Sequence, residues 1–325
     1  MHGLVTVFGG SGFVGGQVVR ALAKRGLRIR VAVRNPGSGY KLRMLGDVGQ
    51  IEVVQANIRM PASLTRALEG AESCINLVAV MHERGRQKFQ SVHAMGARNI
   101  AEAAKTAGVT RLVHVSAIGA DADSKSKYAS TKAMGEAAVR EVMPSTTILR
   151  PSIVFGPEDD FFNRFARMAC ASPVLPLIGG GHTRFQPVFV GDVANAVAAC
   201  LLDAATAGKT YELGGPGVFT FKALMEQLCE EIGRKPFLVP VPFEIASLIG
   251  LGGDLVNLQP FPIAPPLTSD LVILLRKDNV VAPGALTLAD LGVAPTAIEP
   301  ILPTYLYRYR RGGQYADQLT TAAKA

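Results

Sequence analysis

The chain has 325 residues, of which 48% are hydrophobic and 18% charged, and its net charge is +8. This composition excludes a disordered chain, and 34 glycines and 20 prolines without a repeating period exclude a collagen-like one. The length predicts one large α/β unit with an appendage, or two domains. Tryptophan is absent and aromatic residues make up 6%, which argues against a surface that stacks bases or sugars.

The positive charge is concentrated near the N-terminus. Residues 1–50 contain eight Lys and Arg residues but a single acid, Asp47. A basic region attracts an anionic ligand such as a phosphate group, and because no nucleic-acid-binding motif accompanies it, we expect no nucleic acid partner. The cysteines form no CxxC pair and the histidines no HxxxH motif, so we predict reduced thiols, structural histidines and no metal site. The residues concerned are Cys74, Cys170, Cys200 and Cys229, and His82, His93, His114 and His182.

The first 150 residues alternate between strand and helix patterns. Strands are predicted at 4–9, 28–33, 51–57, 74–80, 111–117 and 145–154, and helices at 12–25, 62–69, 88–107 and 127–142. Regular alternation predicts an α/β fold with a doubly wound parallel sheet, covered by helices on both faces. We therefore predict a Rossmann domain over residues 1–155, with the final strands of its sheet contributed by later segments.

The second half of the chain has a different composition and no regular alternation of strand and helix patterns. Segment 173–190 is rich in Pro and Gly, and helices are predicted at 190–204 and 220–232. The stretch from Pro236 to Pro303 holds eleven of the twenty prolines, and we predict it to be irregular. Region 156–325 is expected to cover a substrate or to dock on a partner. Since prolines interrupt its apolar runs, we expect a soluble or peripheral protein.

Glycines follow the first predicted strand in a phosphate-binding pattern. The sequence Gly9-Gly10-Ser11-Gly12-Phe13-Val14-Gly15 contains GxGxxG between a strand and a helix, which is the context that a dinucleotide-binding turn requires. Glycine allows the backbone to turn sharply and to approach the pyrophosphate, which then lies at the helix N-terminus. The motif predicts a bound dinucleotide.

The end of the second predicted strand distinguishes NAD from NADP. An acid about 20 residues beyond the glycines would hold a free ribose 2′-hydroxyl group. This chain has Arg34 there, whose guanidinium can bind a 2′-phosphate in a bidentate manner, although a solvated surface arginine is the alternative. We predict NADP(H) as the cofactor.

A second motif, Tyr128-x-x-x-Lys132, lies on a predicted helix. The spacing of four residues places both side chains on one helix face, where an ammonium group would favour the phenolate and lower the pKa of the tyrosine. Ser116 ends the preceding strand, where its hydroxyl group could polarise a carbonyl. Acid–base chemistry is one interpretation, and a helix-surface lysine is the other.

Together these motifs resemble the extended branch of the short-chain dehydrogenase/reductase superfamily, as does LRPSIVFGP at 149–157. The resemblance implies that Ser116, Tyr128 and Lys132 are catalytic: serine orients the substrate, tyrosine is the acid or base, and lysine binds the nicotinamide ribose. It also implies contact with the adenine by Asn57, where the family usually has aspartate. The residues predicted to bind the cofactor are Gly9, Gly10, Ser11, Gly12, Phe13, Val14, Gly15, Arg34, Asn57, Ile58, Leu77, Val78, Ala79, Ser116, Tyr128, Lys132, Pro151 and Ile153.

Longer blocks are similar to one family within this superfamily. Segments 75–80, 96–121, 148–166, 175–194 and 267–281 resemble the NAD(P)H-binding accessory subunits of respiratory complex I, in their alphaproteobacterial form. The resemblance implies a tightly held, structural NADPH outside the electron path, other subunits of complex I as partners, and a peripheral position on the cytoplasmic face of a bacterial inner membrane near the quinone site. Two alternatives stay open: a freestanding NADP-dependent reductase, epimerase or dehydratase, and a module that senses the NADP/NADPH ratio.

Two clusters of polar residues remain. Glu158, Asp159 and Asp160 are predicted to form a solvated acidic loop. A basic aromatic cluster near the C-terminus is either an exposed tail or a contact for lipid headgroups or a partner subunit, since Tyr and Arg suit such interfaces. Its members are Tyr305, Tyr307, Arg308, Tyr309, Arg310 and Arg311.

Overall fold

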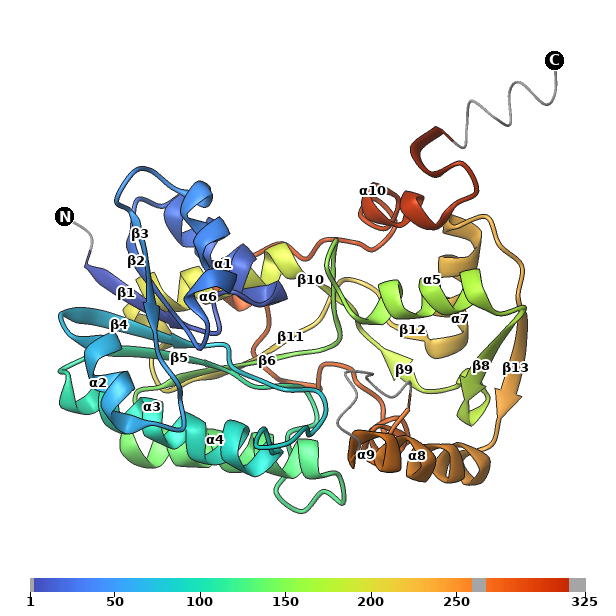
Figure 1. The fold of residues 1–325 in the computed structure, drawn as a ribbon, viewed down its shortest axis with the longest axis horizontal. Helices are drawn as coiled ribbons and strands as arrows, with labels where there is room; N and C mark the ends of the chain where they lie inside the picture. Colours follow the sequence, from blue (N-terminus) through green and yellow to red (C-terminus); the bar gives the residue numbers. More distant parts are fainter. Residues whose placement is uncertain (1–2, 259–266, 316–325) are drawn as a thin grey trace.

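The computed structural model describes residues 3–258 and 267–315, which form two lobes (Figure 1). The first lobe contains a seven-stranded sheet in which every strand is parallel to its neighbours. From edge to edge the strands are β11 (Thr210–Leu213), β6 (Thr147–Pro151), β5 (Arg111–Val115), β4 (Ala71–Asn76), β1 (Leu4–Phe8), β2 (Arg28–Val33) and β3 (Ile51–Gln55). The last strand along the chain, β11, thus joins the sheet from beyond residue 155.

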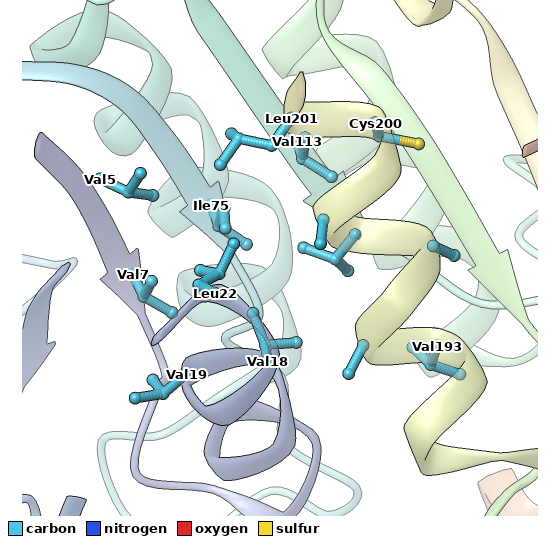
Figure 2. Packing of buried hydrophobic residues seen from close by; sticks show 14 of the residues in the cluster. Val5, Val7, Val18, Val19, Leu22, Ile75, Val113, Val193, Cys200 and Leu201 are labelled. Atoms are coloured by element: carbon cyan, nitrogen blue, oxygen red, sulfur yellow. The ribbon is translucent and has the colours of Figure 1, made fainter. Parts of the chain in front are cut away.

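Helices cover both faces of the sheet. One face carries α1 (Phe13–Ala23) and α6 (Val190–Leu202), and the other carries α2 (Pro61–Leu68), α3 (Met95–Thr106) and α4 (Lys127–Val142) (Figure 1). The side chains of Val18 and Leu22 on α1 and of Val193 on α6 are fully buried over the sheet (Figure 2). The doubly wound α/β fold is therefore confirmed.

The order of the strands sets where a ligand can bind. Strand β1 pairs with β2 on one side and with β4 on the other, so the connections leave β1 in opposite directions. In an open parallel sheet this reversal leaves a crevice at the carboxyl ends of the strands, where ligands bind. The turn at Gly9, the end of β4 and the end of β5 all lie at that edge of the sheet.

The second lobe is built around aromatic side chains. Phe155, Phe162 and Phe221 are buried in it, and the rings of Phe155 and Phe162 meet edge to face. Its elements are β7 (Val154–Phe155), α5 (Phe161–Ala171), β8 (Val174–Ile178), β9 (Arg184–Phe185), β10 (Val188–Phe189), β12 (Phe219–Thr220), α7 (Phe221–Glu231), β13 (Phe237–Val241), α8 (Phe243–Leu258), α9 (Ser269–Leu274) and α10 (Pro303–Leu306).

The prediction of an irregular stretch from Pro236 to Pro303 is wrong for three of these elements. Strand β13 pairs in parallel with β8, and α8 runs for sixteen residues before α9. The reason is the position of the prolines: none lies between Pro242 and Pro260, so nothing removes a helical hydrogen bond from α8. Residues 259–266 of this stretch lie outside the described residues.

The end of the chain folds back onto α5, which corrects two predictions. The side chain of Tyr305 is 4% exposed, and its hydroxyl group donates to Asp159 Oδ2 at 2.6 Å. Asp159 is therefore buried, and burial raises the pKa of its carboxyl group, so the acidic loop is not fully solvated. Tyr309 donates to Asn163, and Arg310 pairs with Glu231. The interpretation as an exposed tail is thus wrong for Tyr305, Tyr309 and Arg310. Tyr307, Arg308 and Arg311 stay exposed.

Three further observations concern the described residues alone. None of their helices is long and apolar enough to span a bilayer. They contain no group of three or more His, Cys, Asp or Glu residues that could hold a metal ion. All four cysteines are free thiols, and burial raises the pKa of Cys200 to about 12 and that of Cys229 to about 11. The thiols of Cys200 and Cys229 are therefore protonated at neutral pH and are poor nucleophiles.

Candidate functional site

The turn between β1 and α1 is shaped by three glycines that the protein itself requires. Gly9 has a φ of +82°, a conformation that side chains rarely adopt. A Cβ atom at Gly10 would lie 2.6 Å from Val31 Cγ1, and one at Gly15 would overlap the Gly9 carbonyl oxygen and lie 2.6 Å from Gly10 Cα. These glycines let α1 pack closely on the turn.

Gly12 is different, because nothing within the chain requires a glycine there. Its backbone is extended (φ −81°, ψ 177°), and a Cβ atom would meet only the Gly9 carbonyl oxygen, at an ordinary 3.4 Å. Gly12 is also the N-cap of α1, and no side chain caps this helix end. The first-turn N–H groups of Phe13 and Val14 lack intrahelical acceptors and carry the positive end of the helix dipole. Open space beside such donors suits the pyrophosphate of a dinucleotide.

The ends of β2 and β3 provide the predicted contacts for the adenosine end. Arg34 follows β2 and is exposed. Asn57 follows β3, and its Oδ1 atom accepts a hydrogen bond from the Arg59 N–H at 3.1 Å. Oδ1 keeps a second lone pair and Nδ2 carries two N–H groups, so Asn57 can both accept a hydrogen bond from a base and donate one to it. Ile58 beside it is buried.

The end of β4 lies against the glycine turn. The Leu77 N–H donates to the Phe8 carbonyl at 3.0 Å, and a Cβ atom at Gly9 would lie 3.1 Å from the backbone of Leu77 and Val78. Ala79, one residue further on, is exposed. The structure therefore brings the predicted segment 77–79 beside the predicted phosphate-binding turn.

The end of β6 is fixed by a residue that the sequence analysis did not identify, Asn279. Its Oδ1 atom accepts from the Ser152 hydroxyl group at 2.7 Å and from the Ile153 N–H at 3.1 Å, and its Nδ2 group donates to the Ile118 carbonyl at 3.3 Å. Asn279 thus joins the segments after β5 and β6, next to the predicted cofactor contacts Pro151 and Ile153. Only its place in the family-like block 267–281 could have indicated it.

Ser116 follows β5, and Lys132 of α4 binds the last residue of the same strand. Lys132 is 2% exposed, and its Nζ donates to the carbonyl of Val115 at 2.9 Å. Burial lowers the pKa of this lysine to about 8. The Ser116 hydroxyl group is also buried, and it has no hydrogen-bond partner among the described residues. A buried hydroxyl group without a partner is costly, which indicates that a ligand completes its bonding.

Tyr128 is held by aromatic rings, and its pKa differs from the expected direction. Its ring contacts Phe89 and His93 edge to face, with centroids 5.8 Å and 5.3 Å away. Burial, with a contribution from the carboxylate of Asp270, raises the pKa of Tyr128 to about 12. The expectation of a lowered pKa is therefore wrong for this structure. The ammonium group of Lys132 donates to the Val115 carbonyl, whereas the carboxylate of Asp270 accepts from the backbone N–H of Tyr128.

His93 contacts Tyr128 and forms hydrogen bonds with two neighbouring segments. It lies in a π-helical turn (Gln90–Ala94) before α3, where its Nε2 accepts from the Val80 N–H at 3.1 Å and its Nδ1 lies 3.2 Å from Thr131 Oγ1. Burial and the charge of Lys132 lower the pKa of His93 to about 3, so the ring is neutral. His93 is thus a bonded structural histidine, as predicted, but one that supports the tyrosine.

The fold and this site define the class of protein. Residues 5–214 match the NAD dependent epimerase/dehydratase family, and the chain belongs to that family. The matched residues include the seven-stranded sheet except for Leu4, the glycine turn and the Ser116, Tyr128 and Lys132 positions.

Similarity to particular relatives extends further along the chain. It is 37% identical over 316 residues to the mitochondrial NADH dehydrogenase (ubiquinone) 1 alpha subcomplex subunit 9 of Arabidopsis thaliana, covering 95% of this chain and 79% of that protein. The predicted resemblance to complex I accessory subunits is thereby confirmed. The chain is also 35% identical over 242 residues to the ceramide reductase of Caulobacter vibrioides, covering 74% of each chain.

A solved structure shows the same fold. The crystal structure of an NADPH-dependent quinone oxidoreductase of Escherichia coli, complexed with NADPH, has a TM-score of 0.72 and 23% identity, covering 93% of this chain and 98% of that one.

Proposed function

We propose that this protein is an accessory subunit of a bacterial NADH:quinone oxidoreductase, which holds NADP(H) as a structural group and stabilises the peripheral arm near the quinone site. The observation that carries the proposal is the extent of similarity. The relatives that are complex I subunits match across 94–95% of the chain, including most of the region beyond residue 214 that the family match does not reach.

The cofactor would be held by the chain's own groups at the ends of β1 to β6. The free N–H groups after Gly12 would bind the pyrophosphate and Arg34 the 2′-phosphate. Asn57 would contact the adenine, and Lys132 would bind the nicotinamide ribose. A bound nicotinamide could accept or supply hydride. Here we assign it a stabilising role, because a ligand that binds only the folded state raises the free energy of unfolding.

Helix α8 supplies a surface for the partner subunit. Two of the residues that α8 turns inward are small: Ala246 is fully buried, and a Cβ atom at Gly250 would lie 2.8 Å from the Ser269 nitrogen of α9. Phe243, the first residue of α8, is partly buried against the same core. Four of the large apolar side chains of α8 instead face solvent, with exposed fractions of 51% for Ile245, 70% for Leu248, 49% for Ile249 and 57% for Leu251.

A cluster of exposed apolar side chains on one helix marks an interaction surface. Helix α8 contains no Lys or Arg, so it lacks the cations that would bind anionic lipid headgroups. We therefore assign this face to an apolar surface of a complex I subunit. Peripheral attachment to the cytoplasmic face of the inner membrane would follow from that contact, with lipid contact limited to exposed residues such as Tyr307 and Arg311.

Affinity purification of the tagged chain from gently solubilised membranes tests this proposal. We expect subunits of the NADH:quinone oxidoreductase to be recovered with it, together with released NADP(H). The double variant Leu248→Asp/Ile249→Asp should reduce that recovery by about tenfold or more, as for a buried interface anchor. Leu202→Asp, at a leucine 54% exposed on α6, is the matched control. A chain found wholly in the soluble fraction, without these subunits, contradicts the proposal.

A second candidate is a freestanding NADP-dependent reductase. Two observations favour it: the relative named ceramide reductase at 35% identity, and the retained group of Ser116, Tyr128 and Lys132. In this function Ser116 would orient a carbonyl group and Tyr128, which holds its proton at neutral pH, would donate it. Tyr128→Phe should then abolish NADPH-dependent turnover while the affinity for NADPH is kept, whereas the accessory role predicts no turnover in either protein.

A further inference from the structure

The first turn of α4, which carries Tyr128, is bound by a carboxylate from far along the chain. Asp270 Oδ1 accepts a hydrogen bond from the Lys127 N–H at 2.6 Å. Asp270 Oδ2 accepts from the Tyr128 N–H at 3.2 Å and from the hydroxyl group of the N-cap residue Ser126 at 2.9 Å. Ser126 in turn accepts from the Ala129 N–H at 3.2 Å. The free donors of this helix end are thus satisfied by a charged group at the positive end of the dipole.

Asp270 is itself held in place. It is the second residue of α9, whose N-cap Thr268 accepts from the Leu271 N–H at 3.2 Å. Val272 on the same helix is 1% exposed and packs in a small core with α8. Further along the segment, Lys277 forms an ion pair with Asp121 at 3.2 Å. The carboxylate therefore reaches α4 from a fixed support rather than from a free tail.

Tyr128 has few other restraints. Its ring lies against Phe89 and His93, which limit its sideways movement. Asp270 accepts a hydrogen bond from the backbone N–H of Tyr128 and so restrains the backbone position of this residue. The titratable groups around Tyr128 are Asp270 from α9, the neutral His93 from the π-helical turn, and Lys132, whose Nζ is bound to Val115.

We propose that Asp270 is the positioning residue for Tyr128, because its carboxylate fixes the first turn of α4 and sets the electrostatic environment of the phenol group. The inference rests on the proposed function in one respect, namely that Tyr128 belongs to the nucleotide site. Asp270 acts through the helix and touches no ligand. The C-terminal segment 267–281 thereby becomes part of the site, which links the second lobe to the ligand-binding edge of the sheet.

Ionisation of Tyr128 provides a readout that a merely structural role would not change. The tyrosinate absorbance of the purified chain is titrated, and the curve of the same protein carrying Tyr128→Phe is subtracted. Since the Asp270 charge helps to raise the pKa of Tyr128, Asp270→Asn should ionise Tyr128 at lower pH. Asp270→Glu keeps the charge and should remain closer to the wild type. Asp278→Asn is the matched control, because Asp278 in the same segment binds Arg184 instead.

Hydrogen exchange measures the second part of the proposal. In Asp270→Asn the amides of Lys127 and Tyr128 should exchange about tenfold faster or more, the factor expected when one hydrogen bond to a charged acceptor weakens. Unchanged exchange and an unchanged Tyr128 titration in Asp270→Asn would overturn the proposal. Both measurements use the nucleotide-free chain and need no turnover. A failure to recover complex I subunits would therefore leave this result unaffected, and the two proposals can fail separately.

Discussion

Replacing Gly12 and Gly15 separately by alanine should separate ligand binding from folding. The two glycines lie in the same turn, but the structure requires a glycine only at position 15. A Cβ atom at Gly15 would lie 2.6 Å from Gly10 Cα, inside van der Waals contact, so the backbone of the turn must move. Overpacking of this kind costs about 1–3 kcal/mol of the free energy of unfolding.

Alanine at Gly12 meets no such obstacle, since its Cβ atom would have one neighbour, at 3.4 Å. The loss of a glycine N-cap should cost about 1 kcal/mol at most. The added methyl group would instead occupy the space in front of the first-turn N–H groups. Losing one hydrogen bond to a charged phosphate costs about 1.5–3 kcal/mol, which corresponds to a dissociation constant about 10 to 150 times larger.

Urea unfolding and calorimetric titration with NADPH measure the two effects independently. We expect Gly12→Ala to bind NADPH at least about tenfold more weakly at nearly wild-type stability. Gly15→Ala should be less stable even without nucleotide. If Gly12→Ala bound NADPH as tightly as the wild type, the turn would not be the pyrophosphate site and the reasoning from its open space would be refuted.

Two further predictions concern charge. Arg34→Glu should weaken NADPH binding by about tenfold or more and leave NADH binding unchanged, because a carboxylate repels the 2′-phosphate. Arg28→Glu, at the other end of β2, is the control for the change in net charge. Equal losses of affinity for both nucleotides would contradict the assignment of Arg34 to the 2′-phosphate. His93 and His114 have pKa values lowered from 6.5 to about 3, chiefly by burial. Below about pH 6.5 the unfolded chain therefore binds more protons than the folded chain. The free energy of unfolding should decrease as the pH is lowered, by up to about 1.4 kcal/mol per pH unit for each histidine. Urea unfolding between about pH 7 and 5 measures this slope, which His114→Gln should reduce; an unchanged slope in that variant would show that His114 is not the cause.

Local sequence patterns predicted most of the helices and strands of the first lobe. The alternation of β-branched runs and amphipathic stretches places each strand and helix within a few residues, because these patterns report which face of an element is buried. The helix predicted at 127–142 is observed at Lys127–Val142. The glycine pattern also acts locally, since Gly9 needs a positive φ and Gly15 contacts its own turn.

What the sequence could not reveal depends on contacts between distant segments. In the sequence, the stretch after Pro242 is a run of apolar residues followed by prolines. Only the packing of Gly250 against α9 shows that the side chains of Leu248 and Ile249 are turned outward. Because Asp159 lies between two other acids in the sequence, it is predicted to be solvated. In the structure, Tyr305, which is 146 residues away, covers it and donates a hydrogen bond to it.

The sequence by itself determined the doubly wound sheet, the glycine turn and the residues at the ends of the strands, because backbone preference and hydrophobic periodicity are properties of neighbouring residues. The tertiary structure alone determined which groups hold Tyr128 and in which direction its pKa is shifted. Its pKa depends on burial and on Asp270, which lies 142 residues away in the sequence and reaches α4 from the second lobe.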